Sequence, residues 1–207
     1  MPFSELNASA AITNFADQAV VLPLAAAILG LFVFMQWWRG AVAWISTVGL
    51  TLALILFLKL RFFACDQMTS EALVRNPSGH TAAAAVVYGS LAIVVVRSFR
   101  EMKRGLLPVT IALSTLIAVV IGISRLELDK HSLQEVFVGS AIGVAGAVSF
   151  AVLAGSPKSN LRFDRLLLLS LAVIVVFYGT ELPIEPHLES IGKHIRHFLI
   201  AAGIGVC

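Results

Sequence analysis

The chain contains little charge. Only 13% of its 207 residues are Asp, Glu, Lys or Arg, whereas 58% are hydrophobic, and the mean hydropathy is +0.92. About 25% charged residues is usual for a soluble domain. This composition excludes an ordinary soluble domain and indicates an integral membrane protein.

Cysteine is also scarce. The two cysteines, Cys65 and Cys207, are too few for a disulfide framework and have no metal-ligand spacing. The chain also lacks segments that alternate apolar and polar residues as barrel strands do. Helices are therefore the expected spanning structures, because lipid offers no partner for open backbone.

Six runs are free or nearly free of charge, and we expect each to be a transmembrane helix. They are Ala19–Trp38, Ala41–Leu58, Thr81–Val96, Gly105–Ser124, Val136–Ala154 and Leu166–Thr180. We expect an all-α, six-helix bundle that forms a single domain over residues 1–207. The first run is too long for a signal-peptide core, so no cleaved leader is expected.

Basic residues gather in alternate loops. Arg39 and Gly40 separate the first two runs, and Trp37, Trp38 and Trp44 beside them predict an aromatic belt at one interface. The loops on this side, which we call the basic face, carry Arg39, Arg97, Arg100, Lys103, Arg104, Lys158, Arg162 and Arg165. The positive-inside rule places the basic face in the cytoplasm of a cell (inner) membrane protein. The opposite side, the motif face, then points toward the periplasm or exterior.

The C-terminal region predicts an amphipathic helix that lies on the motif face. Pro183 and Pro186 are expected to break the sixth helix. Apolar residues then recur at helical spacing with basic residues and histidines between them, which is typical of an interfacial helix.

In the fifth run, Gly139, Gly143 and Gly146 favour close helix packing.

The first polar stretch on the motif face is Asn76-Pro77-Ser78-Gly79-His80. It opens the third run, where free backbone N–H groups and the positive end of the helix dipole attract an anion. Glycine lets the anion approach the backbone, and the Ser78 hydroxyl adds a donor. Pro-Ser-Gly is also an ordinary helix start, so this stretch alone is weak evidence for a site.

The second polar stretch joins Ser124-Arg125 to His131 and Glu135. His131 and Glu135 are four residues apart, so the carboxylate can reach one ring nitrogen and leave the other as a nucleophile or base. Arg125 can hold two phosphate oxygens in a bidentate fork. An isolated histidine–glutamate pair with this spacing is often only a helix-surface pair. The presence of both polar stretches on one face favours a phosphoryl site.

The combination resembles the type 2 phosphatidic acid phosphatase superfamily of membrane lipid phosphatases. Its motifs are K-x6-R-P, P-S-G-H and S-R-x5-H-x3-D. The second is intact at residues 77–80, and the third is present at residues 124–135 with Glu135 for Asp. The resemblance covers about Lys59 to Ala154. The first motif departs, because Lys59 is present but no Arg-Pro follows, and Arg61 and Arg75 are candidate replacements.

By resemblance, His131 attacks phosphorus, Glu135 orients His131, and His80 protonates the leaving oxygen. Arg125, Lys59, Arg75, Ser78 and Gly79 would bind the phosphoryl oxygens. The family implies neither metal nor cofactor. We expect membrane lipids and a lipid phosphate as partners, not nucleic acid, and the sequence leaves the oligomeric state open.

The resemblance predicts a lipid phosphatase that hydrolyses a phosphomonoester or pyrophosphate at the outer face. The sequence is also consistent with two alternatives. One is a lipid phosphotransferase, and the other is a catalytically weak lipid-binding or transport protein. A Cys65–Cys207 disulfide is a further option, because both are expected on the oxidising side.

Overall fold

The computed structural model describes residues 3–65, 76–99, 106–157 and 163–202. Within these ranges every regular element is a helix, and strands are absent. The helices are α1 (Phe3–Asn14), α2 (Gln18–Phe34), α3 (Trp38–Cys65), α4 (Gly79–Phe99), α5 (Leu106–Glu127), α6 (Leu133–Leu153), α7 (Phe163–Phe177) and α8 (Ile184–Ala201). The predicted all-α class is confirmed for this part of the chain.

Five stretches of the described chain are long and apolar enough to cross a membrane. They are Ala8–Phe34, Trp38–Cys65, Gly79–Arg97, Leu106–Glu127 and Leu133–Leu153. The prediction of six spans is not confirmed, because α7 has 15 residues. At about 1.5 Å per residue it rises about 22 Å, less than the ~30 Å hydrocarbon core.

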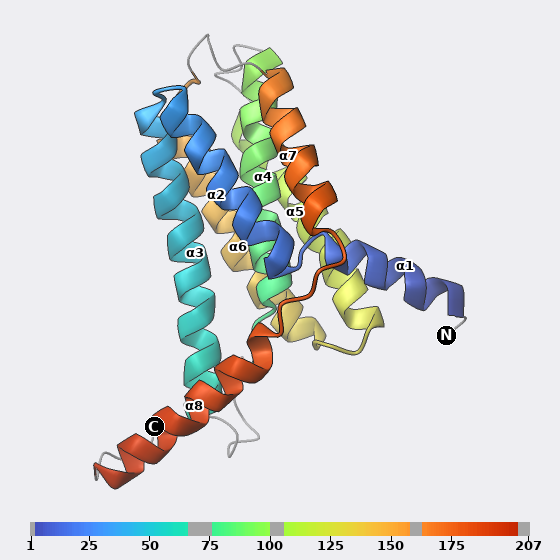
Figure 1. Cartoon of the computed structure of the whole chain (residues 1–207), viewed down its shortest axis with the longest axis vertical. Coiled ribbons are helices and arrows are strands. Elements are labelled where there is room, and N and C mark those ends of the chain that lie inside the picture. Colours follow the sequence, from blue (N-terminus) through green and yellow to red (C-terminus); the bar gives the residue numbers. More distant parts are fainter. Residues whose placement is uncertain (1–2, 66–75, 100–105, 158–162, 203–207) are drawn as a thin grey trace.

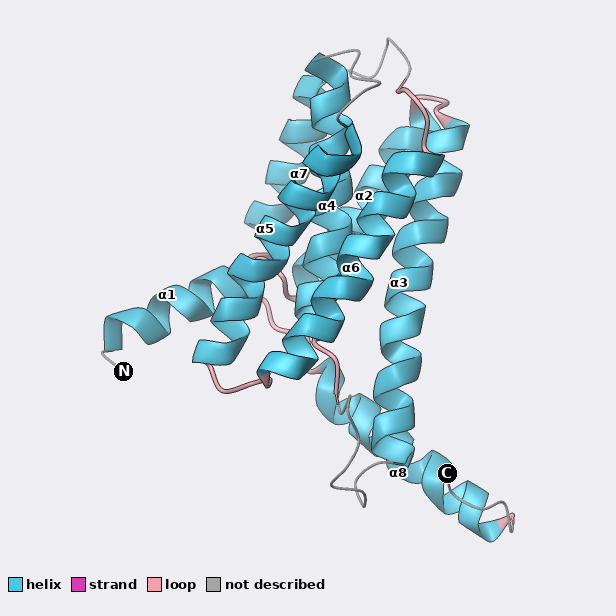
Figure 2. Cartoon of the chain, turned by 180° about the vertical axis from the view of Figure 1, so that it is seen from behind, coloured by secondary structure: helices cyan, strands magenta, loops and turns pink. Residues whose placement is uncertain are grey.

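Helix α4 is at the centre of the bundle and packs against α3, α5 and α6 (Figures 1 and 2). Its residues 82–87 are fully buried, and their small side chains allow neighbouring backbones to approach. A Cβ on Gly139 would lie 2.4 Å from the Ser78 carbonyl oxygen, and one on Gly143 would lie 2.5 Å from that of Ala82. The predicted packing role of these glycines is confirmed.

The tryptophans near the first turn pack mainly in the core. Trp44 is 1% exposed and meets Phe32 and Phe150 edge to face, with ring centroids 5.6 and 5.5 Å apart. Trp37 is also buried, and only Trp38, at 60% exposure, suits an interface. The predicted aromatic belt is therefore wrong for two of its three residues. The turn also comes earlier than expected, between Phe34 and Trp38.

The two terminal helices extend beyond the bundle (Figure 1). Helix α1 points sideways and contacts α5, whereas α8 lies against the end of α3. Gly192 permits this contact, since a Cβ there would be 2.4 Å from Phe63 Cβ. The predicted break after the sixth run is present, because α7 ends at Phe177 and Pro183 is the N-cap of α8. Pro186 does not contribute to this break, since it lies in the first turn of α8, where proline is tolerated.

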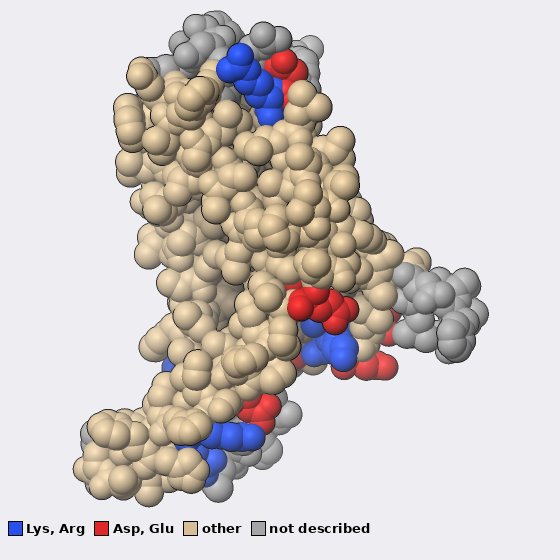
Figure 3. All heavy atoms as spheres, viewed as in Figure 1, with Lys and Arg blue, Asp and Glu red and all other residues tan. Residues whose placement is uncertain are grey.

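Charged side chains mark the two ends of the molecule. On the face drawn in Figure 3, Lys, Arg, Asp and Glu lie near the top and in the lower part, and uncharged side chains cover the region between. This distribution fits a bundle whose middle is in lipid. The polar stretches and the start of α8 are at the lower end (Figure 1).

Candidate functional site

The two polar stretches meet at one end of the bundle. The Ser78 N–H donates to the Glu135 carbonyl oxygen at 3.0 Å. The Asn76 N–H donates to Glu135 Oε1 at 3.1 Å, across 59 positions of sequence. The start of α4 and the start of α6 are therefore joined directly, as predicted from their common face.

Each stretch also begins its helix in a conventional way. Ser78 Oγ lies 2.9 Å from Thr81 Oγ1 and accepts from the Thr81 N–H at 3.4 Å, which caps α4. Ser132 caps α6 and forms a capping box with Glu135. These capping hydrogen bonds thus fix the backbone at the starts of α4 and α6, which carry the candidate catalytic residues.

Glu135 also contacts the candidate nucleophile. Its Oε2 lies 3.2 Å from His131 Nδ1 and accepts from the Ser132 N–H at 2.9 Å. When Nδ1 donates to this carboxylate, Nε2 keeps its lone pair and can attack an electrophile. The His131 side chain is buried, at 2% exposure, so the packing and this hydrogen bond restrict the ring.

Asp17 is a site residue that the sequence analysis did not identify. Its Oδ2 lies 3.5 Å from His80 Nε2, while its Oδ1 accepts from the N–H groups of Ala19 and Leu182 at 2.8 and 3.3 Å. As the N-cap of α2, Asp17 has a fixed carboxylate. The residue precedes the first apolar run, so only the tertiary fold reveals its contact with His80.

Lys59 reaches the site from α3 and is 6% exposed. Its Nζ donates to Asn76 Oδ1 at 2.8 Å and to Glu185 Oε1 at 2.7 Å. Glu185 Oε1 also accepts from Asn76 Nδ2 at 2.8 Å. Gly79 is adjacent, since a Cβ there would lie 3.5 Å from Lys59 Cε. Glu185, in the first turn of α8, is the second site residue that sequence patterns did not reveal.

Arg125 occupies the last turn of α5 and is 7% exposed. Its Nε is buried and has no hydrogen-bond partner among the described residues. Ser124 beside it contacts α1 through Thr13, with 2.7 Å between the hydroxyl oxygens. Of the candidate replacements in the first motif, Arg61 is exposed, and Arg75 lies outside the described residues.

Burial and the charges around the site shift the pKa values of two groups outside the spans. Burial lowers the pKa of His131 below the ordinary 6.5, and Lys59 and Arg125 act in the same direction against two carboxylates. Burial alone would raise the pKa of Glu185, but the charge and hydrogen bond of Lys59 and the Asn76 hydrogen bond lower it to about 2. Near neutral pH the site thus holds a neutral His131 and an ionised Glu185.

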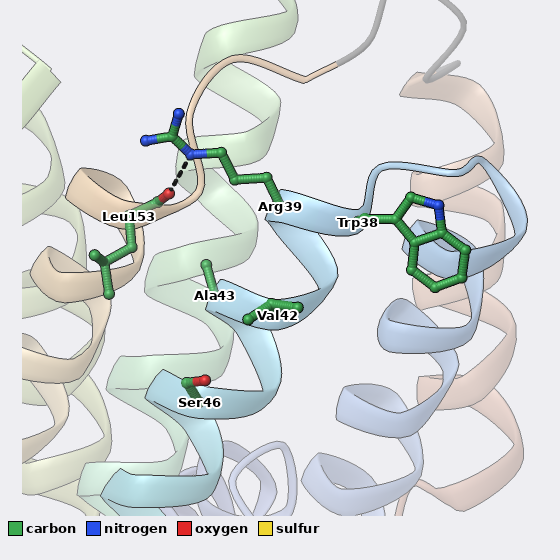
Figure 4. A pocket seen from close by; sticks show the side chains of 6 residues that line it. All are labelled: Trp38, Arg39, Val42, Ala43, Ser46 and Leu153. Carbon is green, nitrogen blue, oxygen red and sulfur yellow. Dashed lines mark hydrogen bonds between the residues drawn. The ribbon is translucent and has the colours of Figure 1, made fainter.

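A groove lies beside the first turns of α3 (Figure 4). It has a volume of about 410 Å³ and is lined by Trp38, Arg39, Val42, Ala43, Ser46 and Leu153. Arg39 Nε donates to the Leu153 carbonyl oxygen at 2.9 Å. Arg39 is 20 residues from Lys59, or about 30 Å along a helix, and the groove has no histidine or carboxylate.

Two further predictions concern cysteine and metal. Cys65, the last residue of α3, is disulfide-bonded, and Cys207 lies outside the described residues. Among the described residues, no group of three or more His, Cys, Asp or Glu side chains is arranged to hold a metal ion.

Comparison with known proteins connects this geometry to a family. The model of the PAP2 superfamily matches residues 54–158, which include both polar stretches and Lys59. A relative from Klebsiella pneumoniae, named as an uncharacterized 22.5 kDa protein in the cps region, is 31% identical over 143 residues, covering 69% of this chain and 67% of the relative. No solved structure matches. With about half of its length matched and both motif stretches included, the chain belongs to the PAP2 superfamily.

Proposed function

We propose that this protein is a membrane lipid phosphatase that hydrolyses a lipid phosphomonoester or pyrophosphate through a phosphohistidine. The PAP2 superfamily generally comprises phosphatases, so family membership indicates activity on phosphate esters. The contact that carries the specific proposal is His131 Nδ1 to Glu135 Oε2, at 3.2 Å. It leaves Nε2 as the free nucleophile of a buried ring.

The reaction has two steps. His131 Nε2 bonds to phosphorus while the phosphorus–oxygen bond to the lipid breaks, and protonated His80 gives its proton to the departing oxygen. Water then attacks the phosphohistidine, His80 takes a proton from it, and phosphate leaves. Arg125, Lys59, Ser78 and the Gly79 N–H stabilise the equatorial oxygens through both steps, and no metal participates.

The substrate would approach along the membrane surface. The site is at the end of the bundle, beside the spans, so a lipid can present its headgroup without leaving the bilayer. The basic loops of the opposite end favour a cytoplasmic location there, which would place the site at the outer face of the cell membrane. Helix α8, with apolar and charged side chains both exposed, is suited to lie in that interface.

The test is phosphate release from a panel of lipid phosphates by the detergent-purified protein. His131→Ala should reduce release to background, and His194→Ala, on exposed α8, should not. Undiminished turnover by the His131 variant would remove His131 from the nucleophilic role.

The catalytically weak, lipid-binding alternative has one observation in its favour. Of the first family motif only Lys59 is present, without the Arg-Pro that follows in the family. The charge of Lys59 is already paired with Glu185. A vanadate-sensitive phosphatase assay separates the two functions. Absence of release from every lipid phosphate would favour the binding protein.

A further inference from the structure

The Glu185 carboxylate lies among the groups that would hold a phosphoryl group. It is 2.7 Å from Lys59 Nζ and 2.8 Å from Asn76 Nδ2. It also interacts electrostatically with His131, His80 and Arg125. Glu185 therefore presents an anionic oxygen to the same cationic end of the bundle that a phosphate oxygen would occupy.

The position of Glu185 is determined by α8 and not by the local sequence of the motifs. Gly192, seven residues later and on the same side of the helix, packs directly against Phe63 of α3. This contact fixes the first turn of α8 over Lys59. Glu185 lies outside residues 54–158, so the family match does not account for it.

The two cationic side chains of the site, Lys59 and Arg125, differ in how many hydrogen-bond partners they have. Lys59 has two partners, Asn76 and Glu185, whereas the buried Arg125 Nε has none among the described residues. An incoming phosphate could bind Arg125 without disturbing the fold. The Lys59 ammonium group has three N–H donors and two acceptors here, so one donor remains for a phosphate. The Glu185 carboxylate beside it repels a second anion and already neutralises the ammonium charge, so a phosphate gains the full ion pair with Lys59 only when Glu185 moves away.

We propose that Glu185 is an internal competitor for the phosphoryl group, and that substrate binds fully only when its phosphate displaces the Glu185 carboxylate from Lys59. The inference rests on the proposed function, since it concerns the same site. It makes Glu185 an affinity-determining residue. A dianionic phosphate has more charge than a carboxylate with which to compete, so Glu185 also favours monoesters over monoanionic diesters.

Binding of inorganic phosphate tests the competition without requiring turnover. Glu185→Gln removes the charge and keeps the shape, and isothermal titration of the detergent-purified full chain with phosphate should give about fivefold to tenfold tighter binding. Glu189→Gln is a matched control. Glu189 is also 43% exposed and 2.7 Å from a lysine, but its partner Lys193 is on the surface. The control should bind phosphate as the unchanged protein does.

Unchanged or weaker phosphate binding by Glu185→Gln would overturn the proposal. Failure of both the unchanged protein and Glu185→Gln to bind phosphate would also overturn it. Weaker binding with reduced kcat would instead make Glu185 a positioning residue for Lys59. Glu185→Ser gives a second measurement if the Gln variant folds poorly. If Glu185→Gln binds phosphate more tightly but no lipid phosphate is hydrolysed, the proposed function fails and the competition stands. If hydrolysis occurs and binding does not tighten, the reverse holds.

Discussion

At the residue scale, Glu135 shows what the glutamate in place of the family aspartate can do. One of its oxygens contacts His131 and the Ser132 N–H, and the other accepts from Asn76. Its carbonyl oxygen accepts from Ser78. A single side chain therefore caps α6, orients the candidate nucleophile and ties it to the other polar stretch.

The lowered pKa of His131 sets an expected pH dependence. Attack requires the neutral ring, and burial together with Lys59 and Arg125 keeps His131 neutral below the ordinary pKa of 6.5. The acidic limb of kcat/KM should therefore fall below pH 6.5. Glu185 raises the pKa of His131, so Glu185→Gln should move that limb to still lower pH. A limb above pH 6.5, measured by phosphate release, would contradict this assignment.

Asp17 should matter through His80. We expect Asp17→Asn to lower kcat about 10- to 100-fold with little change in KM, because the charge that supports protonated His80 is lost. Asparagine caps a helix as well as aspartate does, so α2 should remain stable. Steady-state kinetics with Asp129→Asn, at an exposed position, provides the control. Equal kcat for both variants would show that His80 does not depend on Asp17.

The candidate site could be predicted from sequence where its contacts are local. His131 and Glu135 are four residues apart on one helix start, so their contact follows from helix geometry. The Lys59–Glu185 pair joins residues 126 positions apart, and the contact of Asp17 with His80 also joins distant segments. Such partners depend on how helices pack, which the spacing of residues in one segment does not specify.

At the element scale, the small residues of α6 determine how closely α4 packs. A Cβ on Gly143 would be 2.5 Å from the Ala82 carbonyl oxygen and 2.7 Å from Ala85 Cβ. We expect Gly143→Ala to reduce the free energy of unfolding by about 1–3 kcal/mol, because α4 must move away. Thermal unfolding in detergent measures this loss. Gly30→Ala, with nothing within 4 Å of the new carbon, should cause none. Equal stability of the two variants would contradict close packing.

Hydrophobic runs predicted the central helices well because lipid demands long apolar segments. They did not predict features that depend on how the helices pack against one another. Helix α1 lacks such a run and is held through contacts such as Thr13 to Ser124. Trp37 and Trp44 are in the core, where both rings pack against Phe32 of α2, a contact that composition does not reveal. Helix α7 is short despite its apolar sequence.

At the scale of the whole molecule, the distribution of basic loops predicts how the bundle is oriented. We expect a cysteine at exposed Lys130, beside the candidate site, to react with a membrane-impermeant thiol reagent added to intact cells. A cysteine at exposed Ser156, at the opposite end, should react only after lysis. Labelling is compared with the unsubstituted protein, which has two cysteines of its own. The reverse pattern would place the site in the cytoplasm.

The link between Lys59 and Glu185 also bears on biosynthesis. Lys59 is translated 126 residues before Glu185. Throughout that interval the ammonium group of Lys59 lacks its carboxylate partner, although Asn76 is translated earlier. Insertion must tolerate this charge until translation is nearly complete, and a message truncated ahead of codon 185 would encode a product with a permanently unbalanced cation.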